Sequence, residues 1–137
     1  MLGKVLFDEI REKRGLAYSI GTNYTNFHDV YEYEISGMIS PEATPYIDEI
    51  VRECISMVPS RRDLFDRKLK SCKKQCLMID LSGLELAKDS ASDLVSNHRI
   101  IPIREAWDQL HKVTHEQMAE AAALLSSEQQ YTFITCP

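Results

Sequence analysis

The sequence is poor in the features that mark nucleotide-binding, membrane or disulfide-rich proteins. Only five of the 137 residues are glycine, and no glycine-rich phosphate loop is present. No apolar run approaches the roughly 18 residues that a membrane-spanning helix needs. The first residues do not resemble a signal peptide, and no Cys-x-x-Cys motif occurs. The serines have no recognisable His and Asp partners, so nucleophilic chemistry is also unsupported.

The charge balance argues against a nucleic-acid or anionic-membrane binder. The formal net charge is −5, whereas phosphate binding depends on clustered Lys and Arg. One dense basic stretch exists, and we interpret it as the solvated face of a helix; it contains Arg67, Lys68, Lys70, Lys73 and Lys74. A hydrophobic fraction of 44% and a length of 137 residues are typical of one globular domain.

The four cysteines are predicted to be buried thiols rather than disulfides or metal ligands. They are Cys54, Cys72, Cys76 and Cys136. Cys72 and Cys76 are one helical turn apart and in phase with apolar neighbours, but a metal pair there would need two more ligands. Buried free thiols indicate a reducing compartment. We therefore expect an intracellular, cytoplasmic protein, and a mitochondrial location stays open.

The first part of the chain predicts a helix followed by a β-hairpin. Residues 4–14 have a short apolar stripe, and Gly15 is a typical helix stop. Residues 16–25 and 30–39 alternate as strands do, joined by a turn over residues 26–29. In the first strand, even-numbered residues from Tyr18 to Tyr24 are expected on one face and odd-numbered residues from Ala17 to Asn23 on the other.

The remainder predicts five helices and a last strand. Ser40 is expected to cap a helix that starts at Pro41 and stops at Pro59. A longer helix is predicted from Arg61, with a break at Ser82-Gly83. An apolar stripe then resumes at Leu84, Ala87, Ala91, Leu94 and Val95, and a short helix covers residues 103–112. Thr114 and Gln117 form a capping box for one more helix, and residues 131–136 are predicted to be a strand. The fold class is α+β, with an antiparallel sheet of the hairpin plus the C-terminal strand packed against several helices.

No metal site is predicted from the histidines or acidic residues. His111 and His115 have the i,i+4 spacing of two zinc ligands on a helix. The Thr114 cap lies between them, which puts them on different elements. His28 falls in the hairpin turn, and Glu32 and Glu34 are expected to form the polar side of the hairpin.

Residues 6–20, LFDEIREKRGLAYSI, carry a specific motif. They resemble the pitrilysin/insulinase/mitochondrial-processing-peptidase family of zinc metallopeptidases, the inverzincins. A helix of the form L-F-x-E-[IL]-R-E-K-R-G-L-A-Y is a hallmark of the second, non-zinc domain of that family. The resemblance covers nearly the whole chain and is strongest at residues 6–20. Weaker matches keep the family's order, at Ile39 to Glu42, at the helix from Asp63, at Val113-Thr114 with Met118, and at Phe133.

The resemblance implies a substrate-binding role for Arg11 and Tyr18. The family's second domain supplies an Arg and a Tyr seven residues apart that hold the substrate backbone and stabilise charge on the scissile carbonyl, and Arg11 and Tyr18 have this spacing. The donors of Arg and Tyr suit a peptide carbonyl or an oxyanion. Without the resemblance, Arg11 would be interpreted as a surface ion pair and Tyr18 as packed on the sheet.

The chain departs from a full family domain, because it has no H-x-x-E-H motif and lacks the strand and helix that precede the family's first helix. We therefore expect residues 1–137 to form a single, truncated, non-zinc peptidase-like domain. It would be inactive alone and hold no cofactor, and zinc is expected in a partner domain.

Two functions remain open: the substrate-clamping part of a zinc peptidase, or a scaffold module of the kind found among respiratory-complex core proteins. The expected partners are a peptide or unfolded protein, a zinc-binding domain or subunit of the same family, or a second copy of the chain paired at an open sheet edge, with no nucleic acid and no membrane.

Overall fold

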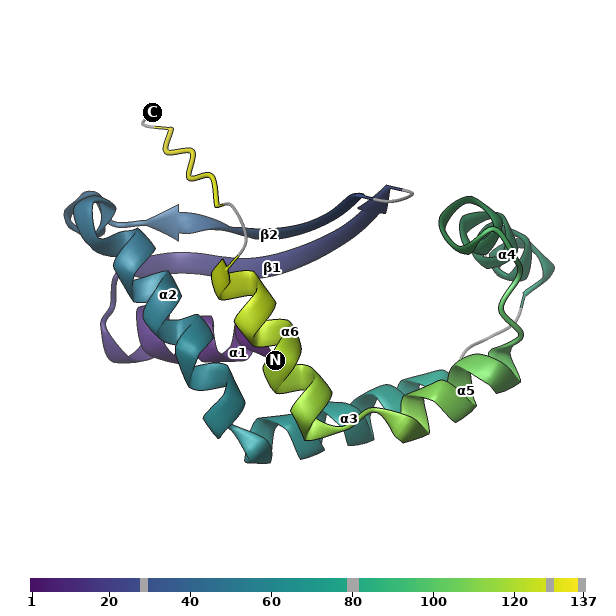
Figure 1. Ribbon diagram of the computed structural model, residues 1–137. Helices are drawn as coiled ribbons and strands as arrows, with labels where there is room; N and C mark the ends of the chain where they lie inside the picture. The colour runs from purple at the N-terminus through teal and green to yellow at the C-terminus, as the bar shows by residue number, and fades with distance from the viewer. Residues whose placement is uncertain (28–29, 79–81, 128–129, 136–137) are drawn as a thin grey trace.

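The computed structural model describes residues 1–27, 30–78, 82–127 and 130–135. Figure 1 shows a long curved hairpin with helices on one side, and two helices that lead away from it to a further helix, α4. The chain starts with α1 (Leu2–Leu6) and the π-helix η1 (Phe7–Lys13). The hairpin follows, formed by β1 (Ala17–Phe27) and β2 (Val30–Ile39). Helices and an antiparallel sheet confirm the predicted α+β class.

The hairpin is confirmed, with one irregularity that the alternation did not predict. Its antiparallel register runs from Ala17 opposite Ile39 to Phe27 opposite Val30, with a β-bulge between Ala17 and Ser19. Ala17 and Ile20 both pack in the core, so the prediction that they face opposite sides is wrong. The extra residue of a bulge shifts the phase of the alternation by one position. β1 also continues through Asn26 and Phe27, which corrects the start of the predicted turn; its remainder, with His28, lies outside the described residues.

The segment after the hairpin begins with a tighter helix than predicted. Pro41–Tyr46 is the 3-10 helix η2, and α2 (Ile47–Met57) follows it, before the 3-10 turn η3 (Val58–Ser60). Ser40 is the N-cap residue and Pro41 begins the helix, as predicted, although the Ser40 side chain makes no capping hydrogen bond. Pro45 lies inside η2, and a proline there removes a donor from the i→i−4 pattern of an α-helix.

The hydrophobic core lies where α1, η1, α2 and α6 meet the start of β1. Val5, Leu6, Ile10 and Cys54 are fully buried. The apolar face predicted for α2 is confirmed, because Cys54 and Ile55 are buried in it and Ile47, Ile50 and Val51 pack against the same cluster.

The second half consists of α3 (Arg62–Leu77), α4 (Gly83–Asn97), α5 (Ile103–Lys112) and α6 (His115–Ser127). Ser82 Oγ accepts a hydrogen bond from Glu85 N at 3.3 Å and so begins α4 at the predicted break. The Thr114–Gln117 capping box is confirmed by two reciprocal hydrogen bonds of 2.9 and 3.2 Å. α3 and α5 run side by side, and α4 lies at their far end (Figure 1).

The predicted C-terminal strand is not formed over residues 131–135, which have no regular secondary structure. The described sheet has only β1 and β2. The tail leaves α6 beside α2, where Thr132 Oγ1 donates to Asp48 Oδ1 at 2.8 Å. This places it next to a helix instead of a strand edge, and Figure 1 shows it projecting away from the hairpin. The sixth residue of the predicted strand, Cys136, lies outside the described residues.

Candidate functional site

A tight turn joins η1, which contains Arg11, to β1, which contains Tyr18. Gly15 has φ +63°, a left-handed conformation that glycine adopts without strain. Gly15 N donates to Arg11 O at 3.2 Å and Leu16 N donates to Ile10 O at 2.9 Å. Ser40 N donates to Leu16 O at 2.8 Å, which ties the turn to the end of β2. The helix end, the turn and both strands are therefore held together by backbone hydrogen bonds.

Arg11 lies on the exposed side of η1. Its guanidinium carbon is 4.8 Å from the centre of the Phe7 ring, within the range of a cation–π interaction. Its Nε is 3.8 Å from Glu12 Oε1, and 44% of the side chain is exposed. Phe7 thus supports the Arg11 side chain while leaving much of it accessible. The spacing of Phe7 and Arg11, one helical turn apart, is the sequence signal that could have revealed this contact.

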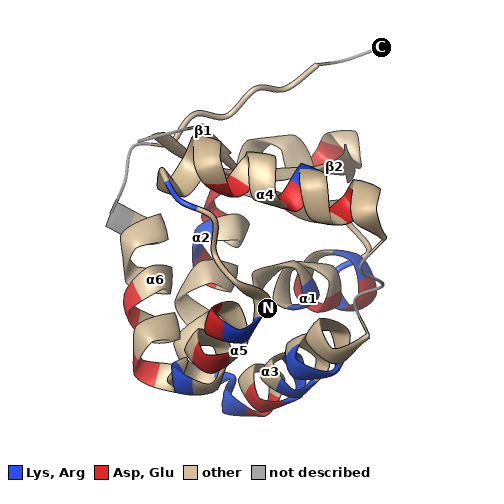
Figure 2. Ribbon diagram, turned by 90° about the vertical axis from the view of Figure 1, so that its right-hand side faces the viewer, with Lys and Arg blue, Asp and Glu red and all other residues tan. Residues whose placement is uncertain are grey.

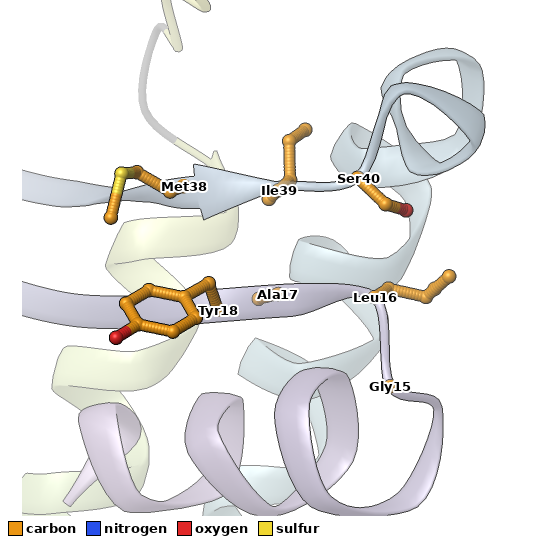
Figure 3. Close-up of a pocket in the computed structure, with 7 residues that line it drawn as sticks. All are labelled: Gly15, Leu16, Ala17, Tyr18, Met38, Ile39 and Ser40. Carbon is orange, nitrogen blue, oxygen red and sulfur yellow. The ribbon is translucent and has the colours of Figure 1, made fainter.

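Tyr18 is the extra residue of the bulge. It is 76% exposed, whereas its neighbour Ala17 is 8% exposed. Figure 3 shows the Tyr18 ring projecting from β1 with its hydroxyl at the outer end. Bulges commonly redirect a side chain next to a functional site. No hydrogen bond joins Arg11 to Tyr18 within the described part of the chain, so their cooperation on a substrate stays a prediction.

A shallow hollow lies beside Tyr18. It has a volume of about 380 Å³ and is lined by Gly15 to Tyr18 and by Met38, Ile39 and Ser40. The Ser40 hydroxyl is buried and has no hydrogen-bond partner among the described residues. At the bulge, Ser19 Oγ accepts a hydrogen bond from Met38 N at 3.3 Å. The sequence does not reveal Met38 and Ser40 as neighbours of Tyr18, because the hairpin register that brings them together is a long-range feature.

An ion pair and a buried thiol lie where η1 meets α2. Arg14 Nη2 donates to Glu53 Oε2 at 2.7 Å, which connects the end of η1 to α2. This hydrogen bond raises the pKa of Arg14 above its ordinary value. Burial raises the pKa of the Cys54 thiol to about 11, so Cys54 stays protonated at neutral pH and is a poor nucleophile.

The cysteines differ from the prediction in their burial. Cys54 is buried as expected, but Cys72 and Cys76 are only partly buried on α3. The prediction of buried thiols is therefore wrong for these two, because α5 covers only part of the α3 surface. Cys136 lies outside the described residues.

Potential metal ligands do not gather anywhere in the described ranges. No group of three or more His, Cys, Asp or Glu side chains there is placed to share a metal ion. His111 is on α5, where its Nδ1 is 2.9 Å from Trp107 O, and His115 starts α6. The prediction that these two histidines lie on different elements is confirmed.

The basic stretch lies along α3, as Figure 2 shows. Arg67, Lys68, Lys70 and Lys74 are exposed and Lys73 is partly buried, in agreement with a solvated helix face. Arg67 pairs with Asp63 at 2.6 Å. Hydrogen bonds from Arg61 and Arg67 hold the pKa of the Asp63 carboxyl well below its usual range. None of the helices in the described segments combines the length and apolar character of a membrane span.

Comparison with protein-family models gives no match for this chain, and comparison with curated proteins gives none either. The peptidase resemblance therefore depends on the residues of the chain itself, above all on residues 6–20.

Proposed function

We propose that this chain is the substrate-clamping, zinc-free domain of a zinc metallopeptidase of the pitrilysin/processing-peptidase kind and that it is inactive alone. The observation that carries the proposal is the accessibility of both predicted clamp residues on the two elements joined by the Gly15 turn. Arg11 is 44% exposed in its side chain and Tyr18 is 76% exposed. The zinc and its activated water would come from a partner domain.

The surroundings of the pair suit a peptide backbone. Arg and Tyr side chains donate hydrogen bonds to carbonyl oxygens. The adjacent hollow is lined mainly by apolar side chains and contains the Ser40 hydroxyl at its edge. An extended peptide could lie along this end of the hairpin, its carbonyls toward Arg11 and Tyr18 and an apolar side chain toward Met38.

The direct test uses fluorescein-labelled β-casein, an unfolded polypeptide, as the probe for both binding and cleavage. Fluorescence anisotropy should report binding by the full chain, while the absence of dequenching should show that the chain cleaves nothing alone. R11M and Y18F should each weaken binding about 5- to 10-fold, since each removes roughly one hydrogen bond worth about 1 kcal/mol.

Two matched variants serve as controls. R62M removes an exposed arginine from α3, and Y46F removes the hydroxyl of an exposed tyrosine outside the hollow. Both should bind casein as the unchanged chain does. Absence of casein binding, or equal losses in the controls and in R11M and Y18F, would refute the clamp.

The scaffold function is the second candidate, and one observation favours it. α4 has no buried residue, and its apolar side chains are available to another protein. A scaffold would keep a strong association with a partner chain and show no casein binding, so the same titration separates the two functions.

A further inference from the structure

α4 differs from an ordinary amphipathic surface helix, because its polar side, and not its apolar side, is partly buried. Its partly buried residues are Ser90, Asp93 and Ser96, all polar, and every other residue of the helix is exposed. Asp93 Oδ2 accepts a hydrogen bond from Ile101 N at 2.9 Å and so fixes the polar side toward the turn that leads to α5. An amphipathic helix normally buries its apolar side. The apolar side of α4 is therefore presented outward.

The outward side is a continuous apolar stripe. Leu84, Ala87, Ala91 and Leu94 follow a 3-4-3 spacing, which is the a and d pattern of a coiled-coil seam over two heptads. Val95 lies beside the seam. Leu84 is 66%, Leu94 51% and Val95 54% exposed. Leu77 and Met78 at the end of α3, and Ile100 and Ile103 after α4, are exposed as well.

The molecule exposes more surface than a compact chain of its size. Its accessible surface is 10101 Å², whereas a compact monomer of this mass has about 7,300 Å². Part of the excess belongs to the projecting tail. The whole excess is larger than the roughly 800 Å² per partner that a stable interface buries, so the chain exposes enough surface for a stable dimer.

The stripe is complementary to itself. When two copies of α4 run antiparallel, Leu84 meets Leu94 of the second copy and Ala87 meets Ala91, so large residues close both ends and small ones allow close approach at the centre. The charged residues Glu85, Asp89 and Asp93 lie off the seam. Lys88, beside the seam, lies near Lys88 of the second copy and is paired with Glu85 of its own helix at 2.8 Å. The two helix dipoles are opposed, which is favourable.

A lipid surface fits the stripe less well than a second copy. Helices that lie in a membrane interface carry Lys and Arg on their polar side. In α4 the charged residues are Glu85, Lys88, Asp89 and Asp93, three of which are acidic, and Figure 2 shows red segments along this helix. An anionic membrane would repel this helix.

We infer that the protein forms a symmetric homodimer through antiparallel pairing of α4 along Leu84, Ala87, Ala91 and Leu94. A two-fold axis passes near the centre of the helix, so each seam residue is used twice. This inference does not depend on the peptidase proposal, because neither Arg11 nor Tyr18 takes part.

Sedimentation equilibrium of the full chain at micromolar concentrations tests the dimer. The unchanged protein should have twice the 15.7 kDa mass of one chain. A91E should be monomeric, with a dissociation constant raised roughly 100-fold or more, because two carboxylates would be buried against alanine. Glu is a good helix former and Ala91 is exposed in the single chain, so an unchanged circular dichroism spectrum should show that A91E remains folded.

The matched control is A123E, which makes the same change at an exposed alanine of α6 and should remain dimeric.

Pairing direction is tested with A87K and A87K/A91E. A87K alone should be monomeric, whereas the double variant should recover the dimer. Antiparallel pairing sets each introduced lysine against the introduced glutamate of the second copy, and parallel pairing would set like charges together.

Four results would overturn the inference. They are a monomeric unchanged protein, a dimeric A91E, a monomeric A123E, and a double variant that stays monomeric. A monomeric protein that co-sediments with phosphatidylcholine vesicles would assign the stripe to a lipid surface instead.

Discussion

At the scale of single residues, Glu9 shows how burial changes the value of an ion pair. Among the residues that the structure describes, Glu9 is the charged residue that is buried in the core, with an exposed fraction of 6%. Lys13 Nζ contacts Glu9 Oε1 at 2.5 Å. Lys4 makes an equally short contact with Asp8, but the Asp8 side chain is 26% exposed and that of Glu9 only 7%. The two pairs share their i,i+4 spacing and differ mainly in the burial of the acid.

Replacement of Lys13 by Met should therefore cost more stability than replacement of Lys4 by Met. K13M leaves a buried carboxylate without its cation and should lower the free energy of unfolding by about 1–2 kcal/mol. K4M breaks an exposed pair and a contact with the Phe7 ring at 5.3 Å, and should cost about 0.5 kcal/mol. Urea denaturation measures both. Equal losses would show that burial of Glu9 does not strengthen its dependence on Lys13.

At the scale of elements, the start of α6 depends on two residues, each of whose side chains accepts a hydrogen bond from the backbone N–H of the other. Gln117 N donates to Thr114 Oγ1, and Thr114 N donates to Gln117 Oε1. α6 brings Ala122 into the core and packs Met118 and Leu125 against it. Loss of the cap at the start of α6 would therefore also weaken the core.

T114A should lower the free energy of unfolding by about 1 kcal/mol, the usual cost of a lost N-cap. S92A is the control, because Ser92 is an exposed residue within α4 and alanine suits a helix interior. Urea denaturation of T114A, Q117A and the double variant should give non-additive losses. Additive losses would mean that the two hydrogen bonds act independently.

At the scale of the whole molecule, stability is concentrated in one half. The core contains residues of α1, η1, β1, α2, η3, α3 and α6, but none of α4 or α5. Regions with few buried apolar side chains open locally at low cost. In a single chain, α4 is therefore held mainly by its own helical hydrogen bonds and by Asp93.

Amide hydrogen exchange should separate the two halves. In the monomeric A91E variant, amides of α4 should exchange at least about 100-fold faster than those of α2, a difference of about 2.7 kcal/mol in opening free energy. In the unchanged protein, protection of α4 should rise with concentration, because dimerisation covers the stripe. Protection of α4 equal to that of α2 in A91E would contradict this division.

The sequence determined the features that depend on neighbours along the chain. The apolar face of α2, the Gly15 helix stop and the Thr114–Gln117 capping box each involve residues within a few positions of one another. Their hydrogen bonds and periodicity are local, so the pattern alone was sufficient to predict them. The hairpin was predictable for the same reason. The assignment of Arg11 and Tyr18 as a clamp comes from the motif at residues 6–20 and stays a prediction.

Only the tertiary structure decided the features that require a partner distant in sequence. The bulge at Tyr18 follows from the need to bury both Ala17 and Ile20 against the helices, which alternation within one strand does not reveal. The stripe of α4 has the pattern of a buried face, yet the fold leaves it exposed. Residues 131–135 have a strand-like pattern but reach no strand edge. A sequence pattern records which face can be buried, whereas the packing of the whole chain decides whether anything lies against it.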